Sequence, residues 1–109
     1  MDELLAQFLN EGPELAQAGA EALLALERRP GERSLVDDAF RAVHTLKGSV
    51  GLFDLPDMAA VLHAAEDVLG AVREGRRTID AAAVGALLAA LDHSERSLAV
   101  LAATGAPPG

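Results

Sequence analysis

Hydrophobic residues recur three or four positions apart in four segments of the chain, which are separated by short polar stretches containing proline or glycine. The segments cover approximately residues 1–29, 34–52, 56–75 and 80–104. This spacing places an apolar stripe along each of four amphipathic helices, and no segment has the alternating pattern of a strand. Because the connections are short, consecutive helices run in opposite directions. The sequence therefore predicts an all-α fold, an antiparallel up-down-up-down four-helix bundle.

The starts of the second and third helices carry residues that favour helix N-termini. Ser34 is followed three residues later by Asp37, which is the spacing of a capping box. Asp54 is a candidate N-cap for the third helix, with Pro56 in the first turn, where a missing N–H costs no hydrogen bond. These signals predict helix starts at Ser34 and just before Pro56.

The first and fourth segments are less regular. Gly12-Pro13 interrupts the first stripe, so either that helix kinks there or a short helix ends and another begins with Pro13 in its first turn. Thr78 or Asp80 is expected to cap the fourth helix. Ser94 falls where the apolar stripe of this helix should continue, which predicts looser packing at that turn.

The composition narrows the class of protein. At 109 residues the chain is predicted to be one domain over residues 1–104, with a linker starting at 105–109, where the composition turns to Gly, Ala and Pro. Half of the residues are hydrophobic but only 3% are aromatic, so Leu, Val and Ala must build the core. The chain has no cysteine, which excludes disulfides and thiolate metal sites and is compatible with the cytoplasm.

The charge and the hydropathy exclude several kinds of partner. The formal net charge of −8 argues against binding to nucleic acid or to an anionic membrane surface. No apolar run approaches the ~18 residues that a membrane span needs. The N-terminus has no basic stretch followed by an apolar one, so Met1 is expected to be a true start rather than the edge of a signal sequence.

One stretch of the second helix carries polar groups that invite a chemical interpretation. His44, Lys47 and Gly48 are spaced to lie on one helical face, opposite a buried stripe that includes Phe40 and Val43. The helix would thus present an imidazole, an ammonium group and a patch of bare backbone to solvent. We interpret His44 as a residue that carries a phosphoryl group.

The third helix supplies a second set of groups. If the chain turns at about residue 54, position 44 lies opposite position 64 in an antiparallel pair, to within about one turn. His63 and Glu66 straddle that position. A Glu66 carboxylate that accepts a hydrogen bond from one ring nitrogen of His44 would fix the tautomer and make the other nitrogen more basic. Lys47 would neutralise charge on the phosphoryl oxygens.

Through the runs FRAVHTLKGS at 40–49 and HAAED at 63–67, the chain resembles the histidine phosphotransfer domain at the N-terminus of CheA-type chemotaxis kinases. The resemblance covers nearly the whole chain. It implies that His44 is phosphorylated by the ATP-binding domain of a kinase and passes the group to an aspartate of a response regulator. It also implies that Lys47 is the charge partner of the histidine, Glu66 its hydrogen-bonding carboxylate and His63 a neighbour in the same network.

The resemblance further implies a module rather than a complete enzyme. ATP and magnesium would be supplied by partner domains, and no cofactor is expected in this domain. No phosphate-cradling glycine-rich loop is present in the sequence, which agrees with that expectation. The expected partners are the kinase ATP-binding domain and a receiver domain, which we expect to dock transiently on the surface around Arg41 and Gly48.

Two alternatives remain open at this point. His44, His63 and Glu66 could ligate zinc or iron, but di-iron bundles use Glu-x-x-His twice, whereas His-x-x-Glu occurs here once and beside a lysine. Alternatively the domain could be a passive adaptor that binds partners through the Gly48 face without any chemistry. His93, on a polar turn of the fourth helix, is expected to be merely solvated.

Overall fold

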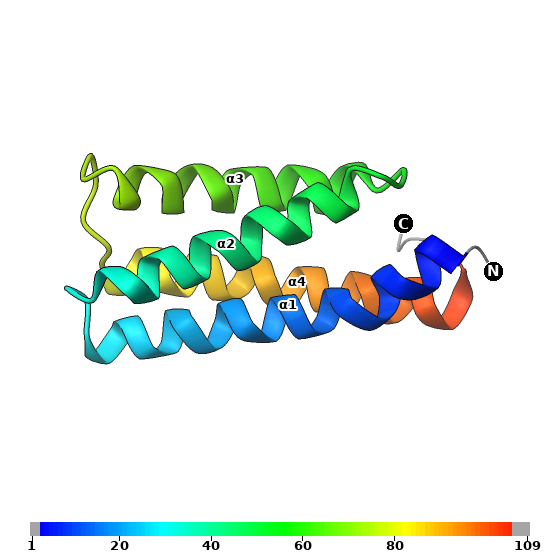
Figure 1. Ribbon diagram of the computed structural model, residues 1–109, viewed down its shortest axis with the longest axis horizontal. Coiled ribbons are helices and arrows are strands. Elements are labelled where there is room, and N and C mark those ends of the chain that lie inside the picture. Colours follow the sequence, from blue (N-terminus) through cyan, green and yellow to red (C-terminus); the bar gives the residue numbers. More distant parts are fainter. Residues whose placement is uncertain (1–2, 106–109) are drawn as a thin grey trace.

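The computed structural model describes residues 3–105, which form four α-helices without a strand among them. They are α1 (Glu3–Arg28), α2 (Arg33–Val50), α3 (Pro56–Arg73) and α4 (Ala81–Thr104). The helices run antiparallel in one elongated bundle, in which α1 begins and α4 ends at the same end (Figure 1). Each helix contacts the next along the chain, and α4 closes the ring against α1. The predicted all-α up-down-up-down bundle is confirmed.

The core is built from aliphatic side chains, as the low aromatic content requires. Leucine supplies most of the large side chains that are fully buried, and Phe8 is the one buried phenylalanine of the described residues. Close-packed helices can bury such a set because Leu and Val fill the space between helical ridges without polar atoms. The fully buried large side chains are those of Leu23, Leu26, Val43, Leu46, Val50, Leu62, Leu69, Leu91 and Leu98.

The first helix passes through Pro13 as one unbroken helix (Figure 1), so the split-helix alternative is wrong. The buried face of α1 offsets the proline's cost of ~3 kcal/mol. Gly12 contributes to this packing: a Cβ there would lie 2.9 Å from Cδ1 of Leu98 on α4. The Gly-Pro pair therefore marks a close approach of two helices rather than a helix boundary.

Both capping assignments for α2 and α3 are wrong. Helix α2 begins at Arg33, one residue before Ser34, and its N-cap Glu32 makes no side-chain capping bond. Asp37 instead accepts a hydrogen bond from Arg73 across the helix pair, at 3.1 Å. At the start of α3 the N-cap is the residue before Pro56 and not Asp54, although Pro56 is the first helical residue as predicted.

The cap of α4 is the predicted Asp80, whose side chain accepts a 2.7 Å hydrogen bond from the Ala83 N–H. The looser packing expected at Ser94 is not found. Ser94 is fully buried, and its hydroxyl donates to the carbonyl of Ala90 at 3.0 Å. The hydroxyl thus has its hydrogen-bond partner on the backbone of its own helix, so a small polar residue fits in the core.

His93 is not simply solvated, contrary to the prediction. Its side chain is half-buried, and its Nε2 atom is buried without a hydrogen-bond partner in the structure. The residue lines an apolar groove of about 400 Å³ between α3 and α4, together with Val61, Ala65 and Leu87. The polar neighbours of His93 in the sequence therefore gave the wrong indication of its environment.

The buried face of α1 differs by one step from the predicted stripe. The spacing of the first apolar stripe includes Ala18, three residues after Leu15 and four before Ala22, but Ala18 is exposed, and Ala16 and Gly19 take inner positions instead. A Cβ at Gly19 would lie 3.0 Å from Cδ1 of Leu91 and 3.4 Å from the Cβ of Ala42. Gly19 therefore lets α1 approach α2 and α4 closely.

This close approach predicts that Gly19→Leu lowers the free energy of unfolding by ~1–3 kcal/mol, because the added side chain must displace its neighbours. The matched control is Gly85→Leu on α4, where nothing lies within 4 Å of an added Cβ. The control should be neutral or slightly stabilising, because leucine favours a helix more than glycine does. Urea unfolding measures both, and equal effects would refute the packing role of Gly19.

Candidate functional site

The antiparallel pairing of α2 with α3 brings His44 and Glu66 together, although they are 22 residues apart in the sequence. The Nδ1 atom of His44 and the Oε2 atom of Glu66 form a hydrogen bond across the two helices. The prediction that position 44 faces position 64 to within one turn is therefore confirmed. The short loop between the helices fixes this register.

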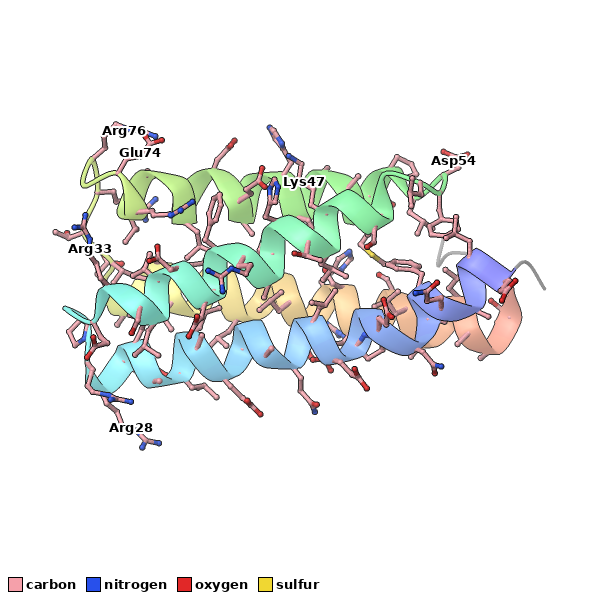
Figure 2. The ribbon with its side chains drawn as sticks, viewed as in Figure 1. Arg28, Arg33, Lys47, Asp54, Glu74 and Arg76 are labelled. Atoms are coloured by element: carbon pink, nitrogen blue, oxygen red, sulfur yellow. The ribbon has the colours of Figure 1, made fainter. Side chains whose placement is uncertain are left out.

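The second oxygen of Glu66 is also occupied. The Nζ atom of Lys47 donates to Oε1 of Glu66 at 2.7 Å. The Glu66 side chain is only 14% exposed, whereas that of Lys47 is 33% exposed. Figure 2 shows Lys47 near the middle of the bundle, where α2 lies against α3. One nearly buried carboxylate thus holds both an imidazole and an ammonium group.

These contacts lower the pKa of Glu66 from its ordinary value of 4.5. The hydrogen bond from Lys47 is the largest cause and the bond with His44 the next, while partial burial acts in the opposite direction. Glu66 is therefore ionised at neutral pH and can only accept hydrogen bonds. Because a carboxylate cannot donate, Nδ1 of His44 must carry the hydrogen.

That tautomer leaves the lone pair of a neutral His44 ring on Nε2. The His44 side chain is 65% exposed, and no other residue of the described chain bonds to its ring. Nε2 therefore lies on the free edge of the imidazole, while the edge that carries Nδ1 is held. This arrangement presents a nucleophile to solvent in a fixed tautomer.

Two residues outside the predicted site lie beside His44: Phe40 contacts its ring directly, and Arg73 contacts Phe40. The ring of Phe40 is half-buried and stacks on the imidazole of His44, with centroids 5.7 Å apart and planes 8° from parallel. The guanidinium carbon of Arg73 lies 4.6 Å from the centroid of the Phe40 ring. The four-residue spacing of Phe40 and His44 on one helix could have predicted the stack. The sequence pattern instead assigned Phe40 to the buried stripe, on the face opposite His44.

His63 does not join the predicted network. Its Nε2 atom lies 3.5 Å from Oδ2 of Asp67, four residues on along α3, and both side chains are mostly exposed. Neither His44 nor Glu66 is its partner. Within residues 3–105, no cluster of three or more His, Asp or Glu side chains could hold a metal ion. The metal-site alternative therefore lacks the third ligand that it assigned to His63.

Arg41 and Gly48 flank the histidine on the exposed side of α2, as predicted. An added Cβ at Gly48 would have no atom within 4 Å, so the backbone is open to an approaching surface. Arg41 lines a groove of about 490 Å³ between α1 and α2, together with Leu15 and Leu35. His44 is thus bordered along α2 by bare backbone on one side and by a guanidinium group at the rim of a groove on the other.

Comparison with known proteins gives one family. Residues 3–97 match the sequence model of the Hpt domain. The chemotaxis protein CheA of Bacillus subtilis is 40% identical over 95 residues, which are 87% of this chain and 14% of that protein. CheA of Treponema pallidum is 36% identical over 91 residues, which are 84% of this chain and 11% of that protein. The chain therefore spans only about an eighth of the length of such relatives.

Solved structures agree with this result. The CheA phosphotransferase domain of Thermotoga maritima superposes with a TM-score of 0.87 at 30% identity, over 94% of this chain and 99% of that domain. The phosphorylated P1 domain of CheA3 from R. sphaeroides, solved in complex with CheY6, has a TM-score of 0.88 at 34% identity, over 97% of this chain and 83% of that one. No helix in the part of the chain that the structure describes is long and apolar enough to cross a membrane.

The lowered pKa of Glu66 makes part of the stability depend on pH. Because the pKa is lower in the folded state than in the unfolded state, the stabilisation is fully present above pH 4.5 and is lost as the pH falls through the folded-state value. Urea unfolding of the wild type and of Glu66→Gln should therefore differ most above pH 4.5, and the difference should shrink in more acidic buffer.

Glu27→Gln, at an exposed position of α1, serves as the control for the loss of one carboxylate. A difference between wild type and Glu66→Gln that stays constant down to about pH 3 would show that the Lys47–Glu66–His44 contacts add no pH-linked stability.

Proposed function

The chain belongs to the Hpt domain family, and from this premise we propose that His44 accepts a phosphoryl group from a histidine kinase and passes it to an aspartate of a response-regulator receiver domain. The observation that carries the proposal is the hydrogen bond between Glu66 and Nδ1 of His44. This bond leaves the lone pair on Nε2, at the exposed edge of the ring.

The first transfer uses this lone pair. Nε2 of His44 attacks the γ-phosphorus of ATP that is bound to the kinase domain. A P–N bond forms while the bond from phosphorus to the bridging oxygen of ADP breaks. The ring then carries a positive charge shared between its two nitrogens, and the Glu66 carboxylate at Nδ1 stabilises that charge. Lys47 lies one helical turn away and can reach the phosphoryl oxygens, where the negative charge accumulates.

The second transfer reverses the chemistry at the ring. A carboxylate oxygen of the receiver aspartate attacks the phosphorus, the P–N bond breaks, and its electron pair returns to Nε2. The imidazole is neutral again, with its hydrogen still on Nδ1. No proton needs to leave or enter the His44–Glu66 pair in either step, so the same geometry serves both directions.

The surface around His44 supports brief docking of two different partners. Gly48 allows a partner backbone to come close, and Arg41 adds a local positive charge. The net charge of −8 gives little long-range attraction to an acidic receiver surface, so we expect apolar contacts to dominate. The R. sphaeroides relative bound to CheY6 supports a receiver as one partner. The relatives named chemotaxis protein CheA, and the Helicobacter pylori relative named sensor histidine kinase CheAY, support a chemotaxis-type kinase as the other.

The nucleotide and the metal ion of the reaction would come from a partner domain. ATP and its magnesium ion would be held by the kinase domain, so this domain acts as a phosphocarrier and not as an autonomous enzyme. Because ATP and receiver domains are found in the cytoplasm, the proposed location of this domain is the cytoplasm.

Labelling with radioactive ATP and a CheA-type kinase core tests the proposal directly. The wild type should incorporate phosphate in a form that is acid-labile and base-stable, as a phosphoramidate is, and His44→Gln should incorporate none. His63→Gln is the matched control and should be labelled like the wild type, because His63 pairs with Asp67 outside the site. An unlabelled wild-type protein would favour the passive adaptor, and label retained by His44→Gln would assign the phosphate to another residue.

The role of Glu66 predicts a slower reaction in its absence. Glu66→Ala should reduce the rate of phosphorylation by ~10²-fold, because the ring loses both its fixed tautomer and the compensating charge. Asp67→Ala, the next residue on α3, removes an exposed carboxylate and should leave the rate unchanged. Quench-flow labelling at saturating kinase measures both rates, and equal rates for the two variants would remove Glu66 from the mechanism.

A further inference from the structure

The hydrogen bond that Nδ1 of His44 donates to Glu66 holds one atom of the ring but does not by itself fix the plane of the ring. The imidazole can still turn by a small angle about its Cβ–Cγ bond, and this rotation changes the position of Nε2 and the direction of its lone pair. The transfer to phosphorus needs an in-line approach, so the direction of the Nε2 lone pair matters. The groups that lie against the face of the imidazole are therefore relevant to the reaction.

Phe40 lies against that face. It precedes His44 by four residues on α2, and the two rings are nearly parallel at a centroid distance of 5.7 Å. This distance lies in the range of offset stacking, which aromatic rings prefer to a direct face-to-face arrangement. The stack opposes rotation of the imidazole about its Cβ–Cγ bond, because that rotation would move the two rings out of parallel, and the bond to Glu66 opposes displacement of Nδ1.

Phe40 is itself held from α3. The Arg73 guanidinium lies over its ring at 4.6 Å, and the Nε atom of Arg73 donates to Oδ1 of Asp37 at 3.1 Å. At Gly70 a Cβ would lie 3.8 Å from the ring edge, so the backbone of α3 borders Phe40 as well. Arg73 and the backbone at Gly70 thus border the Phe40 ring from α3.

The ion pair in this arrangement has little value for stability. The Arg73 and Asp37 side chains are 51% and 45% exposed, and ion pairs in such positions contribute little to the free energy of folding. Phe40 is also only half-buried, whereas the residues around it in the stripe of α2 are fully buried. The Phe40 ring packs partly against the core and partly against the imidazole of His44, and packing in the core alone does not require the second contact.

We propose that Phe40 is a positioning residue for phosphoryl transfer, which sets the plane of the His44 ring and is held in place by Arg73 and Asp37. The inference rests on the proposed function of His44. It adds a second constraint to the one from Glu66, and the two act on different parts of the ring: Glu66 on its Nδ1 edge and Phe40 on its face.

The test compares Phe40→Leu, which keeps apolar volume but removes the flat face, with Phe40→Tyr, which keeps the ring. At saturating kinase, Phe40→Leu should lower the maximal rate of His44 phosphorylation by about tenfold with a much smaller change in KM, because misorientation affects the transfer and not the docking. Phe40→Tyr should keep the maximal rate of the wild type, because it keeps the aromatic face. Arg73→Gln, at a mostly exposed position, should lower it by about threefold.

Phe53→Leu is the matched control. Phe53 is also half-buried and stacks on another ring, that of Phe8, at 5.0 Å and 23°, in a contact that does not include His44. Its substitution costs stability in the same way but should leave the maximal rate unchanged. An unchanged rate in both Phe40→Leu and Arg73→Gln would overturn the inference, and so would a loss of rate in Phe53→Leu equal to that in Phe40→Leu.

A measurement without any phosphate separates this inference from the proposed function. The ring of Phe40 should shift the carbon-bound proton resonances of His44 upfield in the NMR spectrum, and the shift should disappear in Phe40→Leu but persist in Phe40→Tyr and Phe53→Leu. If the wild type shows the shift but takes no phosphate, the stack stands and the proposed function fails. If the wild type is phosphorylated but His44 shows no ring-current shift, the proposed role of Phe40 fails alone.

Discussion

The site depends on one carboxylate that binds an ammonium group and an imidazole from the opposite helix. Glu66 on α3 binds Nδ1 of His44 with one oxygen and Nζ of Lys47 with the other. Because Lys47 and His44 each bind one oxygen of the carboxylate, the pKa of Glu66 is lowered in spite of its partial burial, and the carboxylate stays ionised. The tautomer of His44, the exposure of Nε2 and the place of Lys47 beside it all follow from this single contact between α2 and α3.

The bundle provides the rigidity that such a contact needs. Glycines at the inner face of α1 let it approach α4 and α2 to near van der Waals limits, and leucines fill the remaining space. The core side of α2 is thereby packed at Val43 and Leu46, the buried residues that directly precede His44 and Lys47 in the sequence. The histidine can then be highly exposed and still be well placed, because the helix that carries it is packed on the core.

The sequence was sufficient for the helices and for the central pair, since both depend on periodicity and on the length of one loop. His44 and Glu66 could be paired because a short turn leaves only one register within a helical turn. Details that depend on competition between partners could not be predicted. Asp37 matched a capping box, but Arg73 from α3 competes for it across the helix pair. His63 is three residues from Glu66 and four from Asp67, and the four-residue partner prevailed. Pro13 signals a helix end by its local chemistry, yet the packing of α1 outweighs that signal.

A phosphocarrier must offer the same nitrogen to two partners in turn, which limits how its histidine can be supported. Any side chain that covered Nε2 would block one or both partners, so support can come only from the opposite edge of the ring and from its face. The structure uses these two directions, with Glu66 at the Nδ1 edge and Phe40 at the face. Both supports are anchored on α3, which leaves the surface that a partner would approach uncovered. Glu66 itself belongs to α3, and Phe40 contacts Arg73 of α3. In the proposed transfer the α2–α3 pair thus carries all of the supporting groups, and α1 and α4 contribute by packing against this pair.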